Sequence, residues 1–130
     1  MANILVVEDY ESLKQLYASA LKAGGHKVTV VSDGDDAFKQ ATSHTFDIIL
    51  LDLLLEDISG MQFLRLYKPK DHPQTKVIVF SNITDSAAIN EAMSLGAISY
   101  FTKAKYTPKE VLNCINAVLN NQTVPQTPHQ

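Results

Sequence analysis

Short apolar runs alternate with longer segments of helical spacing along this chain. The apolar runs cover residues 3–7, 28–31, 46–51, 77–80 and 99–102. Such short, nearly all-apolar runs are typical of strands buried on both faces of a parallel sheet. Between them, apolar residues recur at the spacing of helices that pack one face against a core. Because parallel strands need crossover connections, the pattern predicts a doubly wound α/β fold with helices on both faces of the sheet.

Glycine and capping residues mark the ends of several predicted helices. Gly24 and Gly25 follow the first helical pattern and Gly96 follows the fourth, and glycine tolerates the left-handed backbone that often ends a helix. The last helix has the clearest start, because Thr107 and Glu110 have the spacing of a capping box. We therefore expect five helices, of which the last has the best-defined beginning.

The other helices and the C-terminal end have weaker signals. A short second helix surrounds Ala37, and a third begins at Ser59 and is broken by the loop at residues 68–73. The fourth helix carries Ile89 and Met93, which we expect to lie in the core. From residue 121 the chain is polar and contains two prolines. We therefore expect one domain at residues 1–120, followed at 121–130 by a disordered tail or the start of a linker.

Composition restricts the class of protein without identifying it. With 130 residues, 45% of them hydrophobic, the chain is long enough for one domain with a substantial core. Its net charge of −3 lacks the basic excess of a nucleic-acid-binding surface. Glu8 and Asp9 follow the first apolar run at once, so we expect no secretory leader. Asp52 breaks the longest apolar stretch, so we expect no segment that inserts into a membrane. A single cysteine is compatible with a cytoplasmic location.

Polar residues stand at the carboxyl ends of four predicted strands. Glu8 and Asp9 follow the first strand, Asp52 the third, Ser81 the fourth and Lys103 the fifth. Ligands of parallel sheets bind at this edge, so we expect these side chains to converge. Neighbouring carboxylates repel one another unless a cation lies among them. Mg²⁺ accepts carboxylate and phosphate oxygens, and Lys103 adds a second positive charge, so the set suits a divalent cation and a phosphoryl group.

These residues resemble the motif of the receiver domain of bacterial response regulators. The resemblance covers residues 1–120 and consists of Glu8 with Asp9, Asp52 with Gly60 eight residues later, Ser81, and Tyr100 three residues before Lys103. It implies a flavodoxin-like five-stranded sheet of order 2-1-3-4-5. It also implies a phosphorylation-activated module of two-component signalling, similar to the single receivers of chemotaxis. Such a module accepts a phosphoryl group and is not an enzyme that turns over an external substrate.

The resemblance implies a role for each acidic position. Asp52 would accept a phosphoryl group from a histidine kinase or a phosphotransfer protein. Asp9, Asp52 and the main-chain carbonyl of Leu54 would bind Mg²⁺, with Glu8 acting through water. Lys103 would pair with the phosphoryl oxygens.

The resemblance also implies how the modification changes a binding surface. Ser81 would move to hydrogen-bond the phosphoryl group, and Tyr100 would change rotamer with it. Together with Lys103, they would relay the change to a face made by the fourth helix, the fifth strand and the last helix. We expect a downstream protein to bind that face, and self-association through it is the alternative.

Three positions differ from the usual receiver pattern. Glu56 stands where proline is common, and Asn82 stands where a small residue is usual. Ala104 replaces the proline that usually follows the lysine in a cis peptide bond. A cis bond before a residue other than proline costs about 2.5–4 kcal/mol. We therefore predict a trans bond between Lys103 and Ala104.

Two other functions are compatible with the same fold. A small Mg²⁺-dependent phosphohydrolase could use Asp52 as its nucleophile. Enzymes that resemble the haloacid dehalogenases have a second acid two residues after the first, where this chain has Leu54. The third hypothesis is an adaptor that has kept the fold but works without phosphorylation. The complete set of Asp9, Asp52, Ser81 and Lys103 argues against it.

Overall fold

The computed structural model describes residues 1–55 and 57–122. In chain order its elements are β1 (Asn3–Val7), α1 (Glu11–Ala23), β2 (Lys27–Val31), α2 (Gly34–Ser43), β3 (Ile48–Leu51), α3 (Gly60–Tyr67), η1 (Pro69–Asp71), β4 (Lys76–Ser81), α4 (Ser86–Ser94), β5 (Ser99–Thr102), η2 (Lys103–Lys105) and α5 (Pro108–Leu119). The strands pair in parallel in the order β2-β1-β3-β4-β5. The expected α/β fold and its flavodoxin-like strand order are therefore confirmed.

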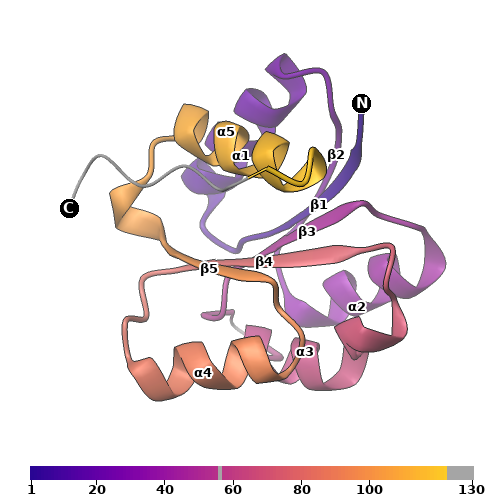
Figure 1. Ribbon diagram of the computed structural model, residues 1–130, viewed down its shortest axis with the longest axis vertical. Helices are drawn as coiled ribbons and strands as arrows, with labels where there is room; N and C mark the ends of the chain where they lie inside the picture. Colours follow the sequence, from indigo (N-terminus) through magenta and orange to yellow (C-terminus); the bar gives the residue numbers. More distant parts are fainter. Residues whose placement is uncertain (56, 123–130) are drawn as a thin grey trace.

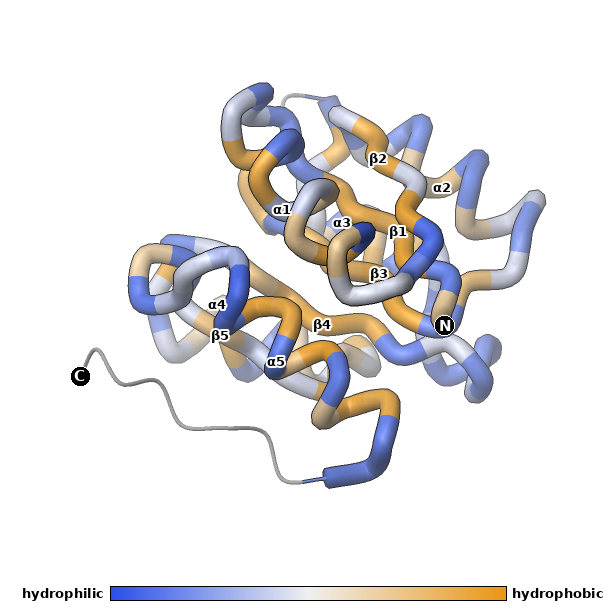
Figure 2. The backbone as a smooth tube through the Cα atoms, turned by 90° about the horizontal axis from the view of Figure 1, so that it is seen from above, coloured by the Kyte–Doolittle hydropathy of each residue, from blue (hydrophilic) through white to orange (hydrophobic). Residues whose placement is uncertain are grey.

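The sheet separates two hydrophobic clusters. Helices α1 and α5 cover one face and α2, α3 and α4 cover the other (Figure 1). Along β4, Val77 and Val79 belong to the cluster beneath α2, α3 and α4, whereas Ile78 and Phe80 belong to the cluster beneath α1 and α5. Hydrophobic residues are concentrated along β1, β3 and β4 (Figure 2). These strands lack polar alternation because both of their faces are buried.

The edge of the sheet and α4 are less buried than the sequence pattern suggests. The residues of β2 and β5 are partly buried or exposed. In α4, Ala92 is fully buried and Ile89 is partly buried. Met93, which we expected in the core, is 39% exposed. That expectation was wrong because α4 packs against the edge strand β5 and uses a small residue for its buried contact.

The helix ends use the predicted signals and one more. Thr107 Oγ1 accepts the N–H of Glu110 at 3.2 Å, and the Glu110 carboxylate accepts the N–H of Thr107 at 2.8 Å, which completes the capping box of α5. Left-handed backbone follows α1 at Gly25 and α4 at Gly96, with φ of 90° and 113°. Helix α3 ends instead at Lys68 with φ 55°, because the proline after it disfavours helical backbone there.

Two further predictions concern the start of β3 and the peptide bond before Ala104. β3 begins at Ile48, two residues later than the apolar run. Asp47, directly before it, also bonds Asn3: its Oδ2 accepts the N–H of Asn3 at 2.8 Å, and its own N–H donates to the Asn3 carbonyl at 2.8 Å. The bond between Lys103 and Ala104 is trans, as predicted.

Some sequence expectations fall outside the region that the structure covers. Glu56 and residues 123–130 lie outside the described residues. The departure from the receiver pattern at Glu56 therefore has no structural counterpart here, and the assignment of residues 121–130 to a tail or linker stays a prediction. Within residues 1–55 and 57–122, no helix is both long enough and apolar enough to cross a membrane.

Candidate functional site

Four neighbouring strands bring the candidate site residues to one edge of the sheet. β1, β3, β4 and β5 lie side by side, and Glu8, Asp52, Ser81 and Lys103 lie at or just beyond their carboxyl ends. Asp52 comes beside Glu8 because the last residues of β1 and β3 are paired. Lys103 follows β5 directly as the first residue of η2. The convergence that the apolar runs predicted is therefore confirmed for the charged groups.

Lys103 forms a buried ion pair with two carboxylates. Its Nζ lies 2.5 Å from Glu8 Oε1 and 2.8 Å from Asp52 Oδ2. Lys103, Glu8 and Asp52 are 9, 2 and 6% exposed. The other oxygens of the carboxylates accept backbone N–H groups, from Tyr10 to Glu8 Oε2 at 3.1 Å and from Leu54 to Asp52 Oδ1 at 3.2 Å. Buried charges need such partners, and here one ammonium serves two carboxylates.

The protonation states of two buried groups follow from this arrangement. Burial by itself lowers the pKa of the Lys103 ammonium. Hydrogen bonds and charge attraction from Asp52 and Glu8 outweigh burial and raise that pKa above its ordinary value of 10.5. Tyr17 of α1 is 4% exposed, and burial raises the pKa of its hydroxyl to about 12. The lysine therefore stays charged and the tyrosine neutral at ordinary pH.

Asp9 completes an acidic cluster with Glu8 and Asp52. One carboxylate oxygen from each of the three lies within 4.8 Å of the others. Oxygens bound to one Mg²⁺ at about 2.0–2.1 Å lie roughly 3–4 Å apart, so small side-chain shifts would bring the cluster into coordination range. Asp9 is only partly buried and so remains accessible to a hydrated cation. The three carboxylates carry more negative charge than the single Lys103 ammonium balances. Because Mg²⁺ prefers oxygen ligands, the residues of the cluster fit this ion.

A hollow of about 490 Å³ opens over the acidic cluster and Lys103. Tyr10, Leu13, Leu54 and Asn82 also line it. Tyr10 and Leu54 are largely exposed, so the charged centre has apolar side chains at its rim. The Leu54 side chain lies at this rim, whereas the metal-ligand role of its carbonyl stays a prediction.

Ser81 and Tyr100 both bind the loop after β4. Ser81 is fully buried, and its Oγ accepts the N–H of Ile83 at 3.3 Å. The Tyr100 hydroxyl donates to the carbonyl of Ile83 at 2.6 Å, and burial raises its pKa. The Ser81 hydroxyl therefore lies near the site but hydrogen-bonds the loop and not Asp52. The switch roles of Ser81 and Tyr100 stay predictions.

Two polar side chains hold the loops around the site in ways that the sequence pattern did not indicate. Asp57 accepts the N–H groups of Gly34 at 2.9 Å and Asp35 at 3.1 Å, which links the β3–α3 loop to the start of α2. Burial by itself raises the pKa of the Asp57 carboxyl, but these bonds outweigh it and lower that pKa. Asn82 Oδ1 accepts the N–H of Ala104 at 2.9 Å. Each bond joins positions that are more than 20 residues apart, so local spacing carries no sign of them.

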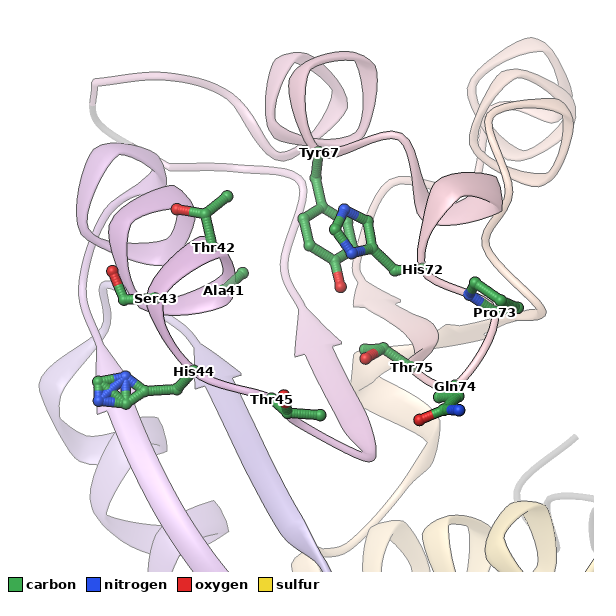
Figure 3. Close-up of a pocket in the computed structure, with 10 residues that line it drawn as sticks. All are labelled: Ala41, Thr42, Ser43, His44, Thr45, Tyr67, His72, Pro73, Gln74 and Thr75. Atoms are coloured by element: carbon green, nitrogen blue, oxygen red, sulfur yellow. The ribbon is translucent and has the colours of Figure 1, made fainter.

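A second hollow, of about 360 Å³, lies at the opposite edge of the sheet (Figure 3). Its lining comes partly from the loops before β3 and β4 and includes Thr45, His72 and Thr75. The ring of His72 stacks on that of Tyr67 at 4.1 Å and 9°. The described lining carries hydroxyl, imidazole and amide groups but no carboxylate. The acidic hollow at the carboxyl edge is therefore the candidate site.

The fold and the acidic site together define a class, the flavodoxin-like α/β domains with a charged pocket at the carboxyl edge of the sheet. The family model described as the response regulator receiver domain matches residues 4–116. The chain therefore belongs to the response regulator receiver family of two-component systems. Members of this family are signalling proteins and not turnover enzymes on external substrates.

Individual relatives agree in sequence and in structure. The response regulator ArlR of Staphylococcus aureus is 31% identical over 122 residues, which cover 94% of this chain and 54% of that protein. The response regulator DrrB of Thermotoga maritima, an OmpR/PhoB homolog, has a TM-score of 0.81 at 26% identity and covers 93% of this chain and 54% of its own. A CheY-like receiver domain protein of Methanospirillum hungatei JF-1 has a TM-score of 0.86 at 22% identity over 94% of this chain and 96% of its own, a likeness of fold alone. This chain spans about half the length of the curated relatives that it matches.

Proposed function

We propose that this chain is a phosphorylation-activated receiver in which Asp52 accepts a phosphoryl group from a histidine kinase or a phosphotransfer protein. The observation that carries the proposal is the buried ammonium of Lys103 between Glu8 and Asp52. A buried ion pair is weak evidence for stability alone. Phosphoryl transfer, in contrast, requires a positioned nucleophile and fixed positive charge more than covalent help from the protein. Membership of the receiver family supports the same assignment.

Asp52 supplies the attacking oxygen in this proposal. One carboxylate oxygen forms a bond to phosphorus as the bond from phosphorus to the donor imidazole nitrogen breaks, and that nitrogen keeps the electron pair. The N–H of Leu54, 3.2 Å from Asp52 Oδ1, holds the carboxylate in one orientation. Lys103 Nζ, 2.8 Å from Asp52 Oδ2, is close enough to attract the phosphoryl oxygens. The product is an acyl phosphate on Asp52.

Mg²⁺ is the proposed cofactor. Asp9, Asp52 and the Leu54 carbonyl would bind it directly, and Glu8 would act through water; the acidic cluster supports this assignment. When bound, the ion neutralises charge on the phosphoryl oxygens. Asp9 adds a carboxylate on the solvent side of the cluster, so it is the residue best placed to receive a hydrated cation.

The signal would leave the site through the loop after β4. A Ser81 hydroxyl that turns to a phosphoryl oxygen gives up its bond to Ile83, to which Tyr100 also bonds. We propose that this changes the face made by α4, β5 and α5. Met93 and Ile98 on or next to these elements are 39 and 43% exposed, and such apolar side chains suit a downstream protein. A second copy of the chain is the alternative occupant.

The proposal has three further parts. The domain ends near residue 120, and residues 121–130 form a tail or the start of a linker. The segment acts in the cytoplasm. It contacts proteins rather than nucleic acid, in keeping with the net charge of −3.

Acetyl phosphate tests the proposed function. The wild type, Asp52→Asn and the control Asp36→Asn, which changes an exposed carboxylate of α2, are incubated with acetyl phosphate and Mg²⁺ and examined by intact mass spectrometry. We expect the wild type and D36N to gain one acid-stable, base-labile phosphoryl group and D52N to gain none. Continuous release of phosphate from added phosphoesters would favour the phosphohydrolase, and no modification of any variant would favour the adaptor.

A further inference from the structure

Asn82 and Ala104 are bonded to each other across two loops. Asn82 Oδ1 accepts the N–H of Ala104 at 2.9 Å, although the residues are 22 positions apart. A small side chain at position 82 has no acceptor that reaches, and a proline at position 104 has no N–H. The bond therefore requires both of these residues at once.

The bond joins the loop after β4 to the backbone that carries Lys103. Ala104 is the second residue of η2, directly after Lys103. Within η2, the bond from the Tyr106 N–H to the Lys103 carbonyl is 3.3 Å long, which is beyond the usual range of about 2.7–3.2 Å. The Asn82 bond is shorter and so is the stronger constraint on this backbone. Asn82 and Lys103 also line the same hollow.

The position of the Lys103 ammonium depends on that backbone. The lysine stem is long and flexible, yet its Nζ lies between Glu8 Oε1 and Asp52 Oδ2 at 2.5 and 2.8 Å. A shift at Ala104 moves the base of the side chain and lengthens one of these two contacts.

We propose that Asn82 is a positioning residue for Lys103 in phosphoryl transfer, an inference that rests on the function proposed above. Through the Ala104 N–H, its amide holds the backbone from which Lys103 reaches Asp52. Movement of the loop after β4 then changes the position of Lys103 through the same bond.

The first measurement tests the bond itself. Asn82→Leu keeps the branched shape of the side chain and has no acceptor, whereas Asn82→Asp keeps a carboxylate oxygen in place of the amide oxygen. We expect the Ala104 amide proton to exchange faster in N82L by hydrogen-exchange NMR and to regain protection in N82D. Equal protection in the wild type and N82L would overturn the proposal.

The second measurement tests the route through Lys103. We expect N82L to slow acetyl phosphate labelling of Asp52 by roughly two- to tenfold, the effect of one hydrogen bond, with a urea midpoint that still leaves the protein fully folded under the labelling conditions. The control Gln74→Leu changes an exposed residue before β4, at the opposite edge of the sheet, and should leave the rate unchanged. In a Lys103→Ala background, N82L should cause no further slowing, because its effect passes through the missing lysine.

Further slowing by N82L without Lys103 would overturn the proposal, since Asn82 would then act on the phosphoryl group or on water. If the wild type is labelled normally and N82L is labelled at the same rate, the role of Asn82 is overturned and the proposed function is not. A wild type that takes up no phosphoryl group overturns the proposed function and this inference with it.

Discussion

Replacing Lys103 with methionine tests whether its ammonium makes two buried carboxylates tolerable. Methionine keeps much of the apolar stem and removes the charge. Glu8 and Asp52 would then face each other with oxygens within 4.8 Å, where two like charges repel by roughly 3.5 kcal/mol at an effective dielectric constant of about 20. Removing one partner of a buried ion pair typically costs about 3–5 kcal/mol. We expect K103M to lose about 3–5 kcal/mol of unfolding free energy.

Urea unfolding followed by far-UV circular dichroism measures this loss without Mg²⁺. Lys39→Met is the matched control, because Lys39 pairs with Asp35 at 3.1 Å on an exposed surface and should contribute less than about 1 kcal/mol. Added Mg²⁺ should stabilise K103M more than the wild type, because in K103M no ammonium neutralises the negative charges of Glu8 and Asp52. A K103M protein within about 1 kcal/mol of the wild type, or an equal response to Mg²⁺, would refute the reasoning.

The same ion pair predicts a dependence on alkaline pH. The pKa of Lys103 is raised above 10.5 in the folded protein, so its stabilisation is fully present below the unfolded pKa and is lost as pH rises through the folded one. Tyr17 has a folded pKa of about 12 and destabilises the fold in the same direction when it ionises. The difference between the wild type and K103M isolates the lysine, and we expect this difference in unfolding free energy to shrink above pH 10.5.

Three further substitutions or measurements test other parts of the structure. Thr107→Ala should cost about 1 kcal/mol in thermal or urea unfolding by removing the cap of α5, and an unchanged midpoint would contradict the cap. Gly60→Ala should destabilise the fold by about 1–3 kcal/mol and slow labelling of Asp52, because its Cβ would lie 2.4 Å from the Asp52 carbonyl oxygen; normal values of both would refute this. Cys114 is 1% exposed and burial raises its thiol pKa to about 11, so it should react with a disulfide reagent only after unfolding, and fast reaction of the folded protein would contradict its burial.

The fold was predictable because its central strands are buried on both faces. Runs such as residues 48–51 are apolar at every position, so these strands can be recognised from the order of apolar and polar residues alone. The polar residues after those runs predicted the convergence of Glu8, Asp52 and Lys103 because the ends of parallel strands meet at one edge. The strand order was not contained in this pattern and came from the resemblance to receiver domains.

The features that the sequence did not predict depend on contacts between distant segments. Met93 has the spacing of a core residue, but its exposure depends on where α4 meets the sheet edge. Asp57 bonds Gly34 across 23 positions, and Asn82 bonds Ala104 across 22. These partners become visible only when the fold places their loops together.

The two hydrophobic clusters on opposite faces of the sheet have a consequence for evolution. The residues beneath α2 and α3 belong to one cluster and those beneath α1 and α5 to the other, so they share few direct neighbours. Substitutions without common partners usually have additive effects. Mutations should therefore accumulate in one layer without compensating changes in the other, which allows the two sides of the protein to diverge at different rates in related lineages.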